Sequence, residues 1–153
     1  MKGTPYLFLG LLAAALGTAQ PVHATLGDSA DSVTADRKAL SAVQAATTTR
    51  NAYTVQEISS DSVAVREYIS PSGTVFGIAW NGLTHPDLTL LLGSYTGEYQ
   101  KSVKQAPRNP GRRFSQIKSD HTVVEKWGHM RNLRGRAYVP SLIPPGVTVD
   151  EIK

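Results

Sequence analysis

Two stretches of the chain carry arginine and tyrosine at the two-residue spacing that places side chains on one side of a β-strand. They supply Arg66, Tyr68, Arg134, Arg136 and Tyr138. A guanidinium group binds a carboxylate or phosphate through paired hydrogen bonds, and tyrosine adds area for stacking. If two neighbouring strands align these faces, we expect the five residues to bind an anionic ligand or an acidic protein. The alternative is a solvated outer sheet face whose arginines pair with the chain's own carboxylates.

Two other residues are candidates for acid–base chemistry. Glu67 falls on the apolar side of its predicted strand, where a carboxylate pairs with an arginine, lies at an unburied strand end or acts in catalysis. His85 stands beside Asp87 at a predicted helix start, where histidine more often forms local hydrogen bonds. The sequence contains no cysteine and no Gly-x-Ser-x-Gly motif. We therefore expect no catalytic residue, and a hydrolase that uses Glu67 or His85 is the alternative.

A metal site is not expected from the histidine spacing. His121 and His129 lie eight positions apart in a region predicted to form a strand. Eight extended residues span about 25 Å, whereas the ligands of one metal ion lie about 2 Å from it. The two histidines cannot share an ion unless the chain turns between them, and no other pattern indicates a cofactor.

The strands that position these residues are predicted from alternating, β-branched segments. Turn sequences separate three of them, and Ser70-Pro71-Ser72-Gly73 suits a tight hairpin. Within the third strand, Phe76, Ile78 and Trp80 are expected on one face, and Val75, Gly77 and Ala79 on the other. The pattern predicts an antiparallel meander over residues 53–80 and a hairpin over residues 122–139.

A helix is predicted to cover this sheet. Pro86 and Asp87 suit the first helical turn, and leucine and tyrosine residues then recur at helical spacing up to Tyr99. We expect one amphipathic helix over residues 86–104, with its apolar face on the sheet. The predicted fold class is therefore α+β, with an antiparallel sheet of about five strands.

The remaining segments are less regular. Residues 25–52 form an acidic, polar segment in which Thr34 is expected to cap a short helix over residues 35–46. Residues 106–120 form a basic loop rich in proline and glycine, and residues 147–149 are expected to add a short edge strand. A single α+β domain is predicted over residues 53–153.

The first 24 residues have the pattern of a cleaved signal peptide. Lys2 precedes an apolar run of 11 residues, and Val22-His23-Ala24 forms a small-residue cleavage site. A membrane-spanning helix needs about 20 apolar residues, so this run is too short to remain as an anchor. We expect cleavage after Ala24, no stable membrane span in the mature chain, and a periplasmic or secreted location.

Charge is unevenly distributed along the chain. Residues 25–99 carry a net charge of −4, and residues 100–136 carry a net charge of +8. Such asymmetry indicates either an anion-binding surface or internal charge balance, with the basic segment lying over the acidic half. The total excess is small and the chain is predicted to be exported, so we do not expect a nucleic-acid partner.

Several short pieces occur in a characteristic order. They are Ala24-Thr25-Leu26-Gly27, Arg66-Glu67-Tyr68, Ser70-Pro71-Ser72-Gly73, Phe76, Trp80, Pro86-Asp87-Leu88 and Leu91-Leu92-Gly93. Together they resemble a family of exported bacterial proteins described as domain of unknown function 2844, most closely over residues 24–100. The resemblance implies a small exported protein of Gram-negative bacteria and supplies no ligand or catalytic residue. We therefore expect a non-enzymatic binding or accessory protein of the bacterial cell envelope.

Overall fold

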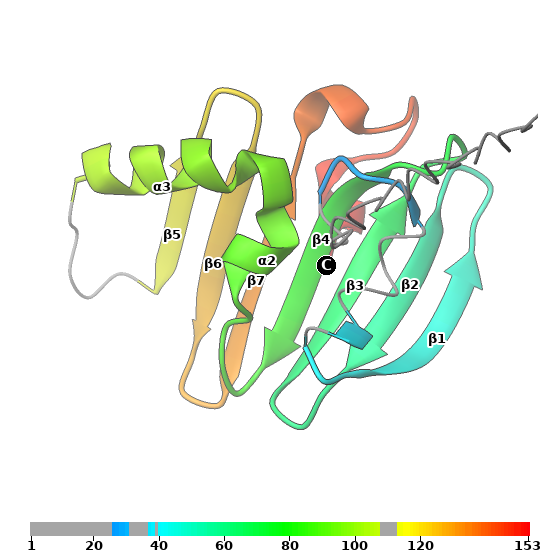
Figure 1. Cartoon of the computed structure of the whole chain (residues 1–153), viewed down its shortest axis with the longest axis horizontal. Coiled ribbons are helices and arrows are strands. Elements are labelled where there is room, and N and C mark those ends of the chain that lie inside the picture. The colour runs from blue at the N-terminus through cyan, green and yellow to red at the C-terminus, as the bar shows by residue number, and fades with distance from the viewer. Residues whose placement is uncertain (1–25, 31–36, 39, 108–112) are drawn as a thin grey trace, which may run out of the picture.

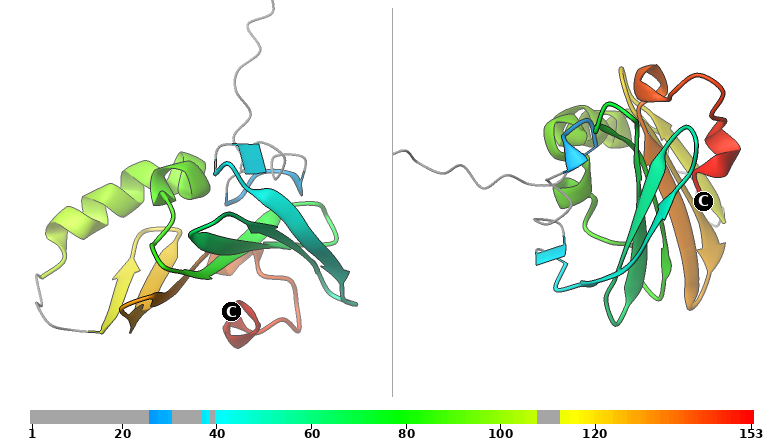
Figure 2. Two further views of the ribbon diagram at one scale, coloured as in Figure 1. Left: turned by 90° about the horizontal axis from the view of Figure 1, so that it is seen from below. Right: turned by 90° about the vertical axis from the view of Figure 1, so that its right-hand side faces the viewer.

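The computed structural model describes residues 26–30, 37–38, 40–107 and 113–153. Seven strands form one antiparallel sheet in the order β1-β2-β3-β4-β7-β6-β5 (Figure 1). The strands are β1 (Val43–Thr49), β2 (Thr54–Ser59), β3 (Val63–Ile69), β4 (Val75–Gly82), β5 (Phe114–Lys118), β6 (Val123–His129) and β7 (Asn132–Tyr138). Helices cover one face of the sheet, and the C-terminal segment lies on the other (Figure 2).

The α+β class, the meander and the hairpin are confirmed, but the sheet has two strands more than expected. Both additional strands, β1 and β5, are edge strands. The helix expected over residues 35–46 is wrong in its second half, because residues 43–49 form β1, while residues 31–36 and 39 lie outside the described part. The β-branched run Thr47-Thr48-Thr49 favours a strand, and pairing with β2 supplies the backbone partners.

The second additional strand lies inside the segment that was expected to be a basic loop. Residues 114–118 form β5 and pair with β6, whereas residues 108–112 lie outside the described part. Four of the five residues of β5 are exposed. Because the strand has no buried face, its sequence does not need the alternation of apolar and polar residues by which a half-buried strand is recognised.

The predicted helix is divided into two by a short 3-10 turn. The elements are α2 (Leu88–Leu92), η2 (Gly93–Tyr95) and α3 (Thr96–Gln105). Asp87 caps α2 by accepting a hydrogen bond from the Thr89 amide at 2.9 Å. The break lies at Gly93, whose positive φ of 47° no longer fits a right-handed helix. No described helix is long and apolar enough to cross a membrane.

A β-bulge changes the predicted alternation of β4. The β3–β4 register shifts between Tyr68 and Ile69, which pair with Gly77 and Val75. Val75 consequently packs with Ile78 and Trp80 on the helix side, while Phe76 joins the cluster on the opposite face. The predicted faces of Val75 and Phe76 are therefore wrong, because the extra residue of a bulge inverts the alternation locally.

The first described residues are part of the core on the helix side. Leu26 is 0% exposed, and its amide donates a hydrogen bond to the Leu91 carbonyl at 3.0 Å. The Gly27 amide donates to the Val75 carbonyl, and the Val75 amide donates to the Asp28 carbonyl. This short segment therefore binds to the start of β4 and closes one end of the core.

The C-terminal segment packs on the opposite face of the sheet through η3 (Pro140–Leu142) and η4 (Val149–Glu151). The short edge strand expected over residues 147–149 is wrong, since a 3-10 turn begins at Val149 and Thr148 forms a capping box with Glu151. Ile152 is fully buried against Gly77, where a Cβ atom would lie 2.8 Å from the Ile152 Cδ1 atom. The absence of a side chain at Gly77 therefore seats the C-terminal segment.

Candidate anion-binding groove

The five predicted ligand-binding residues lie on one face of the sheet. Their strands β3 and β7 are not direct neighbours, because β4 lies between them. Arg66 and Arg136 both pair with Ala79, and Tyr68 and Tyr138 both pair with Gly77. The two arginine–tyrosine pairs therefore face the same side across small residues of β4.

The chain's own C-terminal segment occupies much of this surface. The Tyr68 hydroxyl donates to the main-chain oxygen of Lys153 at 2.8 Å and accepts from the Lys153 amide at 3.0 Å. Arg136 donates to the Val149 carbonyl at 2.7 Å and forms an ion pair with the buried Glu125 carboxylate. Tyr68 and Arg136 therefore hold the C-terminal segment in place.

Tyr138 is also enclosed on this face. Its side chain is buried beside Arg136, whose guanidinium lies 5.9 Å from the ring centroid. Burial raises the pKa of the Tyr138 hydroxyl, and the nearby Glu125 carboxylate adds to that effect. Among the predicted residues, only Arg66 and Arg134 therefore extend beyond the part that the C-terminal segment covers.

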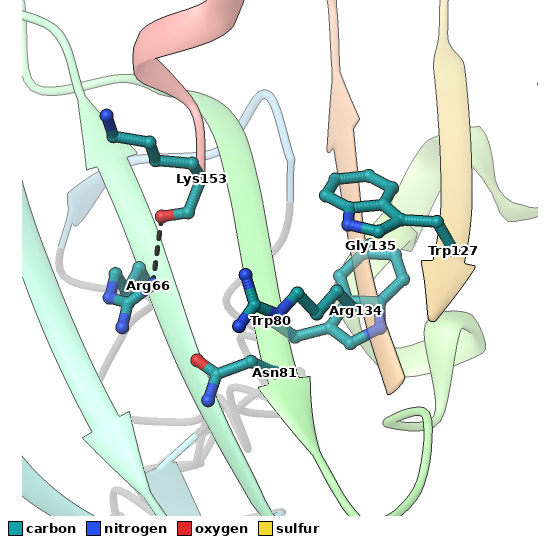
Figure 3. A pocket seen from close by; sticks show the side chains of 7 residues that line it. All are labelled: Arg66, Trp80, Asn81, Trp127, Arg134, Gly135 and Lys153. Carbon is teal, nitrogen blue, oxygen red and sulfur yellow. Dashed lines mark hydrogen bonds between the residues drawn. The ribbon is translucent and has the colours of Figure 1, made fainter. Parts of the chain in front are cut away.

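These two arginines border a groove of about 170 Å³ (Figure 3). The residues that line it are Arg66, Trp80, Asn81, Trp127, Arg134, Gly135 and Lys153. Arg134 extends from β7 across β4 toward Arg66, and Lys153 lies on the Arg66 side, where its main-chain oxygen faces Arg66 and its ammonium group points away from Arg134. Three cationic residues from three separate parts of the sequence therefore line one hollow, and the two arginines direct their charged groups along it.

The three cations differ in how far they are already neutralised. Arg66 forms an ion pair with Glu57 at 2.8 Å and donates to the Lys153 main-chain oxygen at 2.9 Å. Arg134 is exposed and donates to the Asn132 side-chain oxygen at 3.0 Å. Within the described residues, neither Arg134 nor the Lys153 side chain has a carboxylate partner. In the groove, Arg134 therefore carries a positive charge that no described carboxylate neutralises.

Two tryptophans enclose Gly135 at the floor of the groove. Trp80 lies on the helix side, where a Cβ atom on Gly135 would lie 2.2 Å from the Trp80 Cζ2 atom. On the groove side, the Trp127 ring lies over Gly135 (Figure 3). Trp127 pairs across the strands with Arg134, and the Arg136 guanidinium lies 5.8 Å from the centroid of its ring. Sequence reasoning missed this tryptophan, because the β6–β7 register is not readable from the chain alone.

Glu67 lies on the other face of the sheet, as its alternation predicted. It is 1% exposed among apolar residues under the helical layer. Glu67 has an interaction partner within the protein. It lines none of the four hollows described in this structure. Glu67 is therefore separated from the arginine groove by the sheet itself.

His85 forms a contact that the sequence did not predict. Its Nδ1 atom accepts a hydrogen bond from the Trp80 indole N–H at 2.9 Å. Burial lowers the pKa of His85, and the nearby Lys126 charge lowers it further. The neutral ring that accepts at Nδ1 carries its proton on Nε2. His85 lines a hollow of about 250 Å³ with Ser115, but it has no free lone pair with which to activate a nucleophile.

The two histidines considered for a metal site lie near opposite ends of β6. His121 contacts Glu98 of α3, with 3.0 Å between its Nδ1 atom and the carboxylate, and Thr122 donates to the same carboxylate at 2.7 Å. This cluster fastens the helix to the sheet, and the sequence contained no signal for it. No cluster of three potential metal ligands occurs within the described ranges.

Comparison with known proteins supports the resemblance noted in the sequence. The model of the family described as "Protein of unknown function (DUF2844)" matches residues 22–152. No curated protein and no solved structure matches the chain. The matched region extends through β5, β6, β7 and the C-terminal segment, beyond the part where the resemblance was most evident. The chain therefore belongs to the DUF2844 family of proteins of unknown function.

Proposed function

We propose that this protein is an exported, non-enzymatic binding or accessory protein of the bacterial cell envelope, and that its groove holds an anionic group. The signal-peptide pattern of residues 1–24, which lie outside the described residues, supports export. The groove beside the C-terminal segment supports binding, because Arg134 lines it without a carboxylate partner among the described residues. The expected location is the periplasm or the exterior.

The observation that carries the proposal is the position of Arg134. It is exposed, lies opposite Asn81 of β4, and extends toward Arg66 (Figure 3). A bound carboxylate or phosphate can accept hydrogen bonds from two N–H groups of an exposed arginine at once. A ligand that contacts Arg134 would therefore meet a cation that no described carboxylate neutralises.

The arrangement of charge along the fold also supports anion binding. The basic segment, residues 100–136, forms the second half of α3, all of β5 and β6, and most of β7, while β1 to β4 come from the acidic segment. Among ion pairs between described residues, Arg66–Glu57 and Arg136–Glu125 each lie within one segment. Only His121–Glu98 joins the two. The uneven charge of the sequence is therefore not cancelled by lysine or arginine contacts between the described parts of the two segments.

Anion titration tests the proposed site directly. We expect galacturonate and inorganic phosphate to bind the protein in isothermal titration calorimetry, with affinity that decreases as salt is added. Arg134→Ala should weaken binding about tenfold, as expected for one charge-assisted contact. Lys101→Ala, which removes an exposed charge from α3 on the other face, is the control. Equal effects of the two variants, or no binding of either anion, would exclude the groove as an anion site.

Export is tested separately from binding. The protein should be recovered from the periplasmic fraction or the medium with Thr25 as its first residue, by mass spectrometry of the intact chain. A chain that still begins at Met1 in the cytoplasm would overturn the proposed location without affecting the anion titration.

A further inference from the structure

We infer that the ligand of this groove is an acidic oligosaccharide, which extends from the arginines toward the β5 edge of the same sheet face. This inference rests on the proposed function and specifies its ligand. The register places Asn81, Arg134, Trp127 and Phe114 in one row across β4, β7, β6 and β5. Asn81 and the cationic Arg134 occupy one end of this row, and the aromatic Trp127 and Phe114 occupy the other.

The aromatic end of the row is accessible. Phe114 pairs directly with Trp127 across β5 and β6, and its side chain is 52% exposed. Directly opposed side chains of neighbouring strands lie about 5 Å apart. Trp127 and Phe114 therefore lie on neighbouring strands and on the same face of the sheet, and Trp127 is the one next to Arg134.

The dimensions of the row require an elongated ligand. Neighbouring strands are about 4.8 Å apart, so Phe114 on β5 lies about 10 Å from Arg134 on β7 and about 19 Å from Arg66 on β3. A single small anion held by the arginines cannot reach Phe114. A chain of several rings, lying across the strands, contacts both ends at once.

The floor of the groove supplies a polar group that suits a sugar. The Asn81 side chain lines the groove and is partly exposed. A side-chain amide and a sugar hydroxyl each donate and accept hydrogen bonds, whereas an ionised phosphate or carboxylate offers only acceptors. The site thus presents N–H donors for a charged group, an amide for hydroxyls, and flat aromatic area for the apolar face of a sugar ring.

A uronic acid chain combines these three features. Its carboxylate matches the guanidinium forks, its hydroxyls match Asn81, and its C–H faces pack on Trp127 and Phe114. Single-stranded nucleic acid also combines negative charge with stacking surfaces. It is the less favoured ligand, because the predicted export separates the protein from it.

The test uses the full mature chain and four probes. These are galacturonic acid, its linear trimer, the neutral galactose trimer and a thymidine oligonucleotide of three residues. Binding is measured by calorimetry and by acrylamide quenching of tryptophan fluorescence. Trp80 is 2% exposed, so a ligand that shields indole from acrylamide must act on Trp127. We expect the acidic trimer to bind most tightly and to protect Trp127.

Two variants separate the two ends of the row. Arg134→Ala should lower the affinity for both the acidic monomer and the acidic trimer about tenfold. Phe114→Ala should lower the affinity for the trimer several-fold and leave the affinity for the monomer unchanged. Val103→Ala, an exposed apolar residue of α3 on the other face, is the control for loss of apolar surface. Phe114 is largely exposed, so its removal should leave folding intact, which circular dichroism verifies.

The outcomes distinguish this inference from the proposed function. If Arg134→Ala weakens binding of both acidic probes but Phe114→Ala leaves binding of the trimer unchanged, the anion site is supported and the extended saccharide ligand is wrong. If the oligonucleotide binds more tightly than the acidic trimer, or the neutral trimer binds equally well, the ligand class is wrong. If no anion depends on Arg134, the proposed function fails as well.

Discussion

Arg66 donates a hydrogen bond from Nη1 to the main-chain oxygen of Lys153 at 2.9 Å, although the two residues are 87 positions apart. Tyr68, two residues along the same strand face, contacts the same oxygen. One side of β3 thus fixes the end of the C-terminal segment. Arg66 also lines a second hollow, of about 280 Å³, toward Tyr53 and Thr48. The C-terminal segment therefore divides this sheet face into two hollows that share Arg66 and Lys153.

The arginines of β7 should differ sharply in their effect on stability. Arg136→Ala leaves the Glu125 carboxylate buried without its ion pair and releases the Val149 carbonyl, so we expect a loss on the order of 3 kcal/mol in the free energy of unfolding. Arg134→Ala removes an exposed side chain and should change stability by less than about 0.5 kcal/mol. Urea denaturation of both variants checks this. If the two losses are equal, the division between structural and ligand-facing arginines is wrong.

Residues 26–30 should contribute strongly to the stability of the core on the helix side. Leu26→Ala removes a fully buried side chain beneath α2, and we expect a loss of about 2–5 kcal/mol in the free energy of unfolding. Leu83→Ala, which shortens an exposed leucine, is the matched control and should have little effect. Urea denaturation monitored by tryptophan fluorescence measures both. A small loss for Leu26→Ala would show that residues 26–30 are only loosely held.

His85 should make the protein sensitive to mild acid. Burial lowers its pKa in the folded state, and the charge of Lys126 lowers it further. As the pH falls below about 6.5, the unfolded chain binds a proton at this histidine before the folded protein does, so stability decreases until the pH is below the folded-state pKa. Protonation also removes the acceptor for the Trp80 indole.

The variant His85→Gln keeps an acceptor for Trp80 but cannot titrate. The difference in unfolding free energy between wild type and His85→Gln should therefore change between pH 7 and pH 5, with the variant relatively more stable at pH 5. Urea denaturation across this range provides the measurement. A difference that is constant with pH would contradict the assignment.

The His121–Glu98 contact should stabilise the protein within a limited range of pH. Its hydrogen bond and the Glu98 charge raise the pKa of His121, so that contribution is complete below about pH 6.5 and is lost as the pH rises through the raised value. Burial acts to raise the pKa of Glu98, but hydrogen bonds from His121 and Thr122 outweigh it and lower the pKa. That contribution is present above about pH 4.5 and is lost as the pH falls through the lowered value.

Glu98→Gln should remove both pH-dependent contributions to stability, that of the His121 proton and that of the Glu98 charge. Compared with wild type, the variant is expected to lose most stability between about pH 4.5 and 6.5, and less on either side. Thermal unfolding at several pH values, with helix content followed by circular dichroism, tests this. Parallel profiles for the two proteins would show that the contact contributes nothing.

Gly135 should tolerate no side chain. A Cβ atom there would lie 2.2 Å from the Trp80 ring and 2.6 Å from the Glu125 carbonyl oxygen, so Gly135→Ala should cost about 2 kcal/mol or more. Gly97→Ala is the control, because a Cβ atom on this helical glycine meets nothing within 4 Å and alanine is the better helix former. The control is expected to be neutral or stabilising in the same denaturation assay.

Much of the fold followed from local pattern. Alternating apolar residues and turn residues predicted β2, β3, β4, β6 and β7 closely, because a half-buried strand and a proline–glycine turn each carry a local signature. The edge strands were missed for the same reason. Residues of β1 are exposed throughout and those of β5 nearly so, and their conformation depends on hydrogen bonds to β2 and β6.

The sequence alone determined the α+β class and the side of its own strand on which each arginine, each tyrosine and Glu67 lies, since the side follows from a period of two along a strand. Only the tertiary structure decided what those faces do. The strand order inserted β4 between the two arginine strands, and the C-terminal segment closed over Tyr68, Arg136 and Tyr138. The β6–β7 register placed Arg134 opposite Trp127, outside the part that the C-terminal segment covers. Contacts between residues so far apart in the chain depend on strand order and register, which no local pattern encodes.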